Sequence, residues 1–221
     1  MVEAMNISRE YIEGSVRVLA VDSVSLTLRK GEVLLIMGPS GSGKTTLISM
    51  MGCILHPTSG EVSVGGKLVT ALCEDMLPDI RKRYFGFVFQ SFNLFPSLTA
   101  AENVEAVLRL KGQNKGNVRA QALHLLEMVK LNHRKDFYPR DLSGGEKQRV
   151  AFARALAGDP PVILADEPTA NLDSKNATEV LSLLKGLAEG FGKAVAIVSH
   201  DPKTEAFAHR VVFMEDGRLK T

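Results

Sequence analysis

One stretch decides the fold of this 221-residue chain: Gly38-Pro39-Ser40-Gly41-Ser42-Gly43-Lys44-Thr45-Thr46. Residues 38–45 match G-x-x-x-x-G-K-[ST], a pattern that holds nucleotide phosphates when it joins a buried strand to a helix. The apolar run 33–37 just before it predicts the strand, and the residues from Lys44 onward predict the helix. The stretch therefore predicts a nucleotide-binding loop.

The residue types of this loop fit the chemistry of phosphate binding. Its glycines permit tight turns and close approach of the backbone, so successive N–H groups can point at phosphate oxygens. The dipole of the helix that begins near Lys44 favours the same anion, and Lys44 supplies a cation for the β- and γ-phosphates. Thr45 offers a hydroxyl ligand to Mg²⁺. The candidate ATP-binding residues of the loop are Gly38, Ser40, Gly41, Ser42, Gly43, Lys44, Thr45 and Thr46.

Short apolar runs recur along the chain and predict buried parallel strands. Besides residues 33–37, they lie at 85–89, 162–165, 195–198 and 211–214. Helical stretches such as 176–189 separate several of them, an alternation typical of a mainly parallel sheet covered by helices. We therefore expect an α/β fold with a P-loop NTPase core.

Two segments depart from this alternation. Residues 16–28 and 61–69 alternate polar and apolar, which predicts an N-terminal antiparallel β subdomain. The stretch 98–156 looks helical nearly throughout, with Val118, Ala122, Leu125, Leu126 and Val129 on one helical face. We expect a single domain, 1–221, in which residues 1–97 and 157–221 form the core with its β subdomain. Residues 98–156 would form an inserted helical subdomain.

Polar side chains stand at the ends of three predicted strands. The carboxyl ends of parallel strands meet at one edge of a sheet, where open α/β sheets bind ligands. Asp166 is predicted to hold Mg²⁺, directly or through water, and Gln90 to sense metal and water, although a plain surface amide is also open for Gln90. Glu167 is the general-base candidate, and His200 is placed to hydrogen-bond the γ-phosphate or the attacking water.

A second phosphate-binding feature, here named the clip, comprises Ser143, Gly144 and Gly145. It precedes an amphipathic helix that we expect to start near Glu146. Ser143 can cap that helix, and the glycine N–H groups with the helix dipole form an anion site. One chain would then hold two phosphate sites for one ATP. The simplest arrangement places each ATP between the loop of one copy and the clip of another.

In this order, the motifs resemble the nucleotide-binding subunits of ATP-binding cassette (ABC) transporters, over essentially all 221 residues. The resemblance implies a head-to-tail homodimer with two ATP molecules at the interface, where the clip contacts the partner's γ-phosphate. It also implies that Asp173 lies in a loop that communicates across the interface and that Tyr11 stacks on adenine. Asn171 departs from the family, in which Ser or Ala is commoner. The elements that carry the resemblance are 38–46, Gln90, 142–146, 163–167, 171–173 and His200.

Finer details resemble one subgroup, the lipoprotein-releasing, macrolide-exporting and heterocyst-glycolipid-exporting ATPases. They lie in Glu13-Gly14-Ser15, in residues 89–104 and in residues 213–219. This resemblance implies an ATPase that drives a separate membrane permease, sometimes with a periplasmic adaptor, and exports or extracts a lipid, lipoprotein or drug-like substrate. The alternative is a regulatory ATPase of the cell-division type, which gates periplasmic enzymes through a membrane partner without transport. The sequence does not separate the two.

Four apolar residues that follow Gln90 suggest where the permease binds: Phe92, Leu94, Phe95 and Leu98. Our hypothesis is that they line a groove for a short cytoplasmic helix. Packing of the hinge between subdomains is an equally open interpretation.

Charge, cysteine content and hydropathy bear on whether the protein binds nucleic acid, holds a metal through cysteines or spans a membrane. A formal net charge of +2 gives no broad electrostatic case for nucleic acid. The densest basic run, 81–83, is expected to be a solvated surface turn. The 2 cysteines match no metal spacing, and no apolar run approaches the ~20 residues of a membrane-spanning helix. The resemblance to ABC transporter subunits implies a peripheral protein at the cytoplasmic face of the inner membrane.

Overall fold

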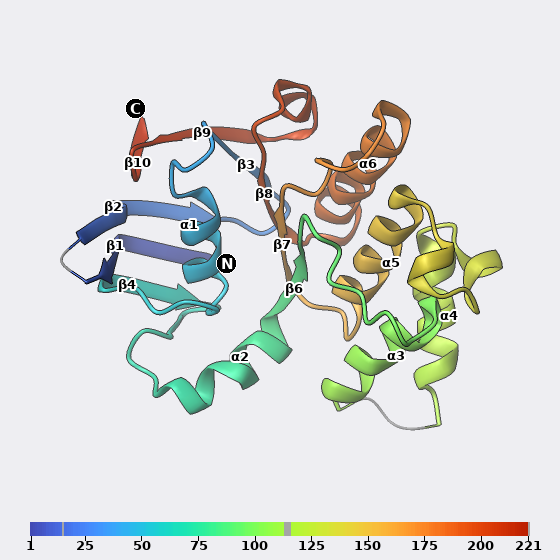
Figure 1. Cartoon of the computed structure of the whole chain (residues 1–221). Coiled ribbons are helices and arrows are strands. Elements are labelled where there is room, and N and C mark those ends of the chain that lie inside the picture. The colour runs from blue at the N-terminus through green and yellow to red at the C-terminus, as the bar shows by residue number, and fades with distance from the viewer. Residues whose placement is uncertain (15, 113–115, 221) are drawn as a thin grey trace.

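The computed structural model describes residues 1–14, 16–112 and 116–220. Ser15, part of the subgroup pattern, lies outside the described residues. A six-stranded sheet occupies the middle of the molecule, with a smaller antiparallel sheet on one side and a group of helices on the other (Figure 1). The predicted α/β fold, with its antiparallel N-terminal sheet, is confirmed.

The larger sheet has the strand order β10-β9-β3-β8-β7-β6. All neighbouring pairs are parallel except β10–β9, and every apolar run that the sequence marked as a parallel strand lies in it. Its strands are β3 (Val33–Met37), β6 (Phe85–Val88), β7 (Val162–Asp166), β8 (Ala194–Val198), β9 (Arg210–Glu215) and β10 (Arg218–Lys220).

The central strands β3 and β8 are buried at every position, which explains why they are apolar without interruption. Toward one edge of the sheet, β9 and β10 stay partly exposed. Along β3, Val33 and Leu35 belong to a core shared with the helices, while Leu34 and Ile36 belong to a core shared with the smaller sheet. Successive side chains of a strand point to opposite faces, so a single five-residue run supplies both cores.

The smaller sheet has the order β2-β1-β4-β5 and is antiparallel throughout. Its first strand was not among the sequence predictions. The pairing of β1 with β2 shifts register three times, and Asn6 has a positive φ of 48°, so no regular alternation marks the strand. Its strands are β1 (Val2–Glu13), β2 (Val16–Leu28), β4 (Ser59–Val64) and β5 (Lys67–Leu68).

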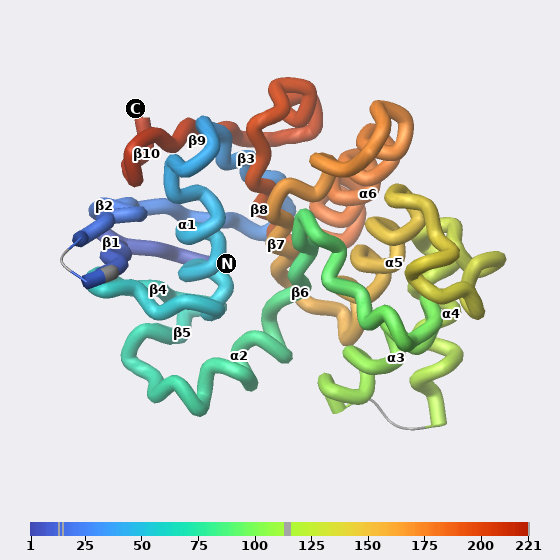
Figure 2. Tube along the Cα trace, in the orientation of Figure 1, coloured from blue at the N-terminus to red at the C-terminus, as the bar shows by residue number. Residues whose placement is uncertain are grey.

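Helices α3 (Ala100–Leu110), α4 (Val118–Met128) and α5 (Gly144–Leu156) lie together on the side away from the smaller sheet (Figure 2). The prediction of nearly continuous helix over 98–156 was wrong in part, because the segment contains less α-helix than expected. Between α4 and α5 the chain forms only the 3-10 turns η2 (Asn132–Arg134) and η3 (Pro139–Asp141), because Lys130 takes a left-handed conformation and Pro139 interrupts helix propagation. The boundaries of an inserted subdomain stay a prediction.

Of the remaining helical elements, some link the two sheets along the chain and others link strands of the larger sheet. The basic run 81–83 lies in α2 rather than in a turn, so that expectation was wrong, and Arg81 donates to the main-chain oxygen of Cys53 at 2.8 Å. The other helical elements are α1 (Lys44–Met51), α2 (Leu77–Tyr84), α6 (Ser174–Phe191) and the 3-10 helices η1 (Glu74–Met76) and η4 (Pro202–Phe207).

Helix α5 packs on β6 so closely that Gly86 has no room for a side chain. A Cβ at Gly86 would lie 2.1 Å from the main-chain oxygen of Ala155. We predict that Gly86→Ala lowers the free energy of unfolding by about 1–3 kcal/mol through overpacking, measured by urea denaturation.

Gly186→Ala in α6 is the matched control. Among the described residues, nothing lies within 4 Å of its added Cβ, and alanine favours a helix by up to about 1 kcal/mol over glycine. Equal stability of Gly86→Ala and the unaltered protein would contradict the packing argument.

Candidate functional site

The loop between β3 and α1 is fixed by close backbone contacts. Gly38 has φ +148° and Gly43 has φ +98°, conformations that side chains rarely adopt. A Cβ at Gly38 would lie 2.0 Å from the oxygen of Met214, and one at Gly43 would lie 2.1 Å from the oxygen of Ala20. Both positions therefore require glycine, and the loop is held against β9 and β2.

The loop forms one wall of a cavity of about 540 Å³. The sequence-predicted residues of three strand ends complete the wall, as expected for the carboxyl edge of a parallel sheet. The lining residues are Ala20, Pro39, Ser40, Gly41, Gly43, Lys44, Thr45, Thr46, Gln90, Glu167 and His200.

Lys44 is buried at the floor of the loop. Its Nζ donates to the main-chain oxygens of Gly38 at 2.8 Å and Pro39 at 2.6 Å, and to Ser42 Oγ at 3.3 Å. Burial lowers the pKa of Lys44, while the charges of Glu167 and Asp166 oppose this shift. The ammonium group is thus a cation held within the loop, close to the cavity that the loop lines.

Thr45 and Asp166 bring two oxygen ligands together. Thr45 Oγ1 donates to Asp166 Oδ1 at 3.2 Å. Burial raises the pKa of Asp166, and the hydrogen bond from Thr45 opposes that rise. Among the described residues, no group of three or more His, Cys, Asp or Glu side chains is arranged to hold a metal. A hydroxyl and one carboxylate nevertheless fit Mg²⁺, which keeps several waters and takes phosphate oxygens as further ligands.

Glu167 is held in a strained backbone conformation beside His200. Its φ is +47°, unusual for a residue with a side chain, and its N–H donates to the Val198 oxygen at 2.9 Å. The carboxylate Oε1 lies 2.8 Å from His200 Nδ1. Glu167 is 15% exposed and His200 67% exposed, so the pair places a shielded carboxylate and an accessible imidazole at the cavity wall.

Gln90 lines the same cavity, and the loop that follows it contains two left-handed residues. Phe92 has φ 59° and Asn93 has φ 49°. Arg154 of α5 donates to the main-chain oxygens of both, at 2.7 Å for Phe92. Sequence reasoning missed Arg154; the signal was a charged residue within the buried face of an amphipathic helix.

The clip caps α5 and lies apart from the cavity. Ser143 Oγ accepts from Glu146 N at 3.3 Å, and Glu146 Oε2 accepts from Ser143 N at 2.8 Å, a reciprocal capping box. The helix begins at Gly144, two residues before the expected start. Ser143, Gly144 and Gly145 are not among the described residues that line the cavity.

Tyr11 and Asp173 also lie outside that lining, as do Gly38 and Ser42 of the loop and Asp166 at the end of β7. Tyr11, on β1, is 37% exposed, and the guanidinium of Arg9 stacks 5.0 Å from its ring centroid. Asp173 caps α6, where its Oδ1 accepts from Asn176 N at 2.9 Å, and this backbone hydrogen bond lowers the pKa of Asp173. A single copy thus assembles the loop and the strand ends but leaves the clip, Tyr11 and Asp173 elsewhere.

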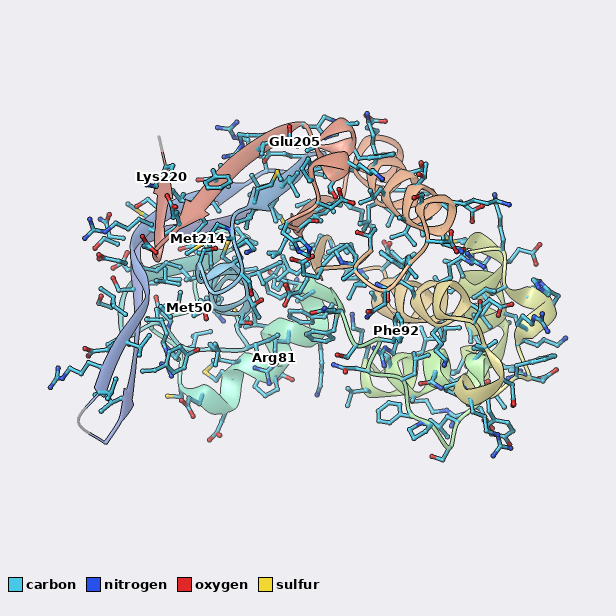
Figure 3. All side chains as sticks on the ribbon, turned by 45° about the horizontal axis from the view of Figure 1, so that its top comes forward. Met50, Arg81, Phe92, Glu205, Met214 and Lys220 are labelled. Carbon is cyan, nitrogen blue, oxygen red and sulfur yellow. The ribbon has the colours of Figure 1, made fainter. Side chains whose placement is uncertain are left out.

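A separate groove of about 690 Å³ opens between α2 and the segment after Gln90. Figure 3 labels Arg81 on α2 and Phe92 on the segment between β6 and α3. Of the four residues expected to line a groove, only Phe95 does so, at 50% exposure, while Leu94 packs against the helical core. Phe87 and Phe89 complete an aromatic wall, and Arg81, Lys82, Lys111 and Arg154 add cations.

Known proteins resemble the whole chain. The sequence profile of the family described as "ABC transporter" matches residues 21–170. An uncharacterized ABC transporter ATP-binding protein of Methanocaldococcus jannaschii, MJ0796, is 44% identical over 224 residues, covering 100% of this chain and 95% of that protein. The macrolide export ATP-binding/permease protein MacB of Burkholderia pseudomallei is 42% identical over 219 residues, covering 99% of this chain and 33% of that protein.

Solved structures agree with these sequence matches. A dimeric post-hydrolysis state of MJ0796, bound to ADP and Pi, has a TM-score of 0.94 to this chain at 43% identity. The match covers 100% of this chain and 97% of that one. Among the described residues of the present chain, no helix has both the length and the apolar character needed to cross a bilayer.

The loop geometry generates a direct test. We predict that Gly43→Ala lowers the affinity for a fluorescent ATP analogue at least tenfold, because the new methyl group would displace the loop from Ala20. Gly41→Ala is the matched control, since an added Cβ there meets nothing within 4 Å among the described residues, although φ is +80°. Equal losses for the two variants would show that conformational strain, rather than the contact with Ala20, controls the loop.

Proposed function

The chain belongs to the family of ABC transporter ATP-binding proteins and is an ATPase, and we propose that two copies close around two Mg-ATP and drive a separate membrane permease. One observation carries the proposal. The cavity that gathers Lys44, Thr45 and Glu167 has no part of the clip among its described lining residues. The clip nevertheless presents a capped helix start suited to an anion. A facing copy would supply the missing half of each site.

Within one copy, the loop binds and orients the phosphates. Its N–H groups and Lys44 hold the β- and γ-phosphates, while the positive end of the dipole of helix α1, which begins at Lys44, adds an electrostatic attraction for these anions. Thr45, Asp166 and Gln90 would hold Mg²⁺, which when bound would neutralise charge on the phosphates. The partly buried carboxylate of Asp166 suits that task because partial desolvation strengthens its attraction for a cation.

Glu167 is the proposed general base. Its shielded carboxylate is directed by the hydrogen bond with His200, so it can accept a proton from a water positioned against the γ-phosphate. His200, which is more exposed, is placed to contact the γ-phosphate itself. Because every copy has Glu167, both sites of a homodimer would hydrolyse ATP.

The dimer is supported by MJ0796, a relative of nearly equal length that is known as a dimer. In a head-to-tail pair, the clip of one copy would cover the cavity of the other, Asp173 would lie at the interface and Tyr11 would stack on adenine. ATP would then hold the two copies together, and hydrolysis would release them.

The permease is proposed from two observations. MacB joins an ATP-binding region and a permease in one protein, and this chain covers 33% of it. The groove at Phe95 presents aromatic side chains and cations at the surface, which suits an amphipathic helix. We propose a peripheral position at the cytoplasmic face of the membrane and export or extraction of a lipid, lipoprotein or drug-like substrate, in some systems with a periplasmic adaptor.

The first test is a trapped dimer. We predict that the Glu167→Gln variant binds ATP but does not hydrolyse it, and that it elutes as a dimer in gel filtration with ATP. The dimer stays closed because the bond between the β- and γ-phosphates is not cleaved. Glu167→Gln combined with Ser143→Arg should elute as a monomer under the same conditions, since the large side chain blocks the clip. A monomeric Glu167→Gln protein would contradict the shared-site arrangement.

The second test concerns the groove. We predict that Phe95→Asp leaves basal ATP hydrolysis in solution unchanged but reduces co-sedimentation with membranes of the source cell at least fivefold. Docking of the permease helix would bury the new carboxylate against apolar side chains, which costs free energy. Phe191→Asp is the matched control, since Phe191 is 66% exposed at the end of α6, outside this groove. Similar sedimentation of both variants would rule out the groove as the docking surface.

A further inference from the structure

The loop that carries Asp173 is fastened within its own chain at two points. This interface loop, residues 170–176, comprises part of the connection between β7 and α6 together with the first three residues of α6. At its start, Asn171 Nδ2 donates to the main-chain oxygen of Gln90 at 3.0 Å. At its end, Asn176 Nδ2 donates to Asp173 Oδ2 at 2.6 Å. Neither asparagine has a role in the proposed chemistry.

Asn176 also joins the interface loop to the clip. Arg149, one turn beyond the clip in α5, donates to Asn176 Oδ1 at 2.8 Å and lies 3.5 Å from Glu179. A Cβ at Gly145 would lie 2.6 Å from Asn176. The clip glycine therefore permits direct contact between the start of α5 and the start of α6.

The far end of α5 returns to the loop after Gln90. Arg154 is buried and donates to the oxygens of Phe92 and Asn93. The contacts consequently form a closed ring. The Gln90 loop, residues 90–95, bonds to the interface loop through Asn171, and the interface loop bonds to helix α5 through Asn176. Helix α5 in turn bonds to the Gln90 loop through Arg154. A closed ring resists separate movement of its members, because moving any one of them breaks at least one hydrogen bond.

We propose that Asn171 and Asn176 are positioning residues that make the Gln90 loop, the interface loop and the clip of one copy move as a single unit. The inference rests on the proposed dimer, because that unit acts on the nucleotide held by the other copy. A movement at the groove beside Gln90 thereby reaches the partner's ATP through the clip and Asp173.

Mixed dimers test the direction of this effect. In the first mixture, unaltered protein is combined with an excess of the double variant Glu167→Gln/Asn176→Ala. Each mixed dimer then has one active site, that of the unaltered copy, and the interface loop facing this site is the loosened one of the variant copy. In the second mixture, the Asn176→Ala variant is combined with an excess of Glu167→Gln. The one active site is then that of the Asn176→Ala copy, and it faces the intact interface loop of the Glu167→Gln copy. We expect the rate of a single round of ATP hydrolysis to be about threefold to tenfold lower in the first mixture than in a reference of unaltered protein with Glu167→Gln. The second mixture should match the reference.

The outcomes separate positioning from general damage. Equal losses in both mixtures would indicate a fold defect and overturn the proposal, as would no loss in either. Lys175→Ala in place of Asn176→Ala is the control within the same loop, and it should leave both mixtures at the reference rate. Failure of Glu167→Gln to form ATP-dependent dimers would instead refute the proposed function.

A second measurement does not require turnover. In the trapped Glu167→Gln dimer, ATP should slow hydrogen exchange at residues 91–95 as well as at residues 40–46. Asn171→Ser, whose shorter side chain cannot span to Gln90, should reduce the protection at 91–95 at least threefold while sparing 40–46. Unchanged protection at 91–95 would contradict the link through Asn171.

Discussion

The site depends on backbone-to-backbone packing of the phosphate loop. The loop can follow its path only because Gly38 and Gly43 let it touch the main-chain oxygens of Met214 and Ala20. These contacts tie β3 to β9 and to β2, which belong to different sheets. The smaller sheet is therefore more than a cover for the core, because it also fixes the loop that the remaining site residues face.

Backbone strain occurs at Glu167, the proposed general base, and in the loop that follows Gln90. Glu167, Phe92 and Asn93 all adopt positive φ angles, which cost of order 1–3 kcal/mol each for side-chain-bearing residues. Each is held by a specific partner, Glu167 by Val198 and the other two by Arg154. The strained conformations persist because buried elements determine them, so the positions of Glu167 and of the Gln90 loop are set before any ligand arrives.

The sequence predicts what is encoded locally. The parallel strands, the phosphate loop and the residues at strand ends could all be placed, because two-sided burial makes the central strands β3 and β8 continuous apolar runs. It did not predict β1, whose register shifts erase alternation, or the contacts of Asn176 and Arg154 with segments 27 and 61 residues away. It left open whether the apolar residues after Gln90 line a groove or pack between subdomains. The groove interpretation holds for Phe95 and not for Phe92, Leu94 or Leu98, since the left-handed turn at Phe92 and Asn93 redirects the chain.

The clip is organised before a second copy approaches. In the capping box, Ser143 Oγ accepts a hydrogen bond from Glu146 N, and Arg134 fixes Glu146 at 2.9 Å. Because the oxygen acts as acceptor, its hydroxyl hydrogen can still be donated to a phosphate, together with the N–H groups at the helix start. In the proposed dimer, little side-chain entropy would then be lost on closure. Binding energy from the partner's ATP would consequently be available to hold the two copies together.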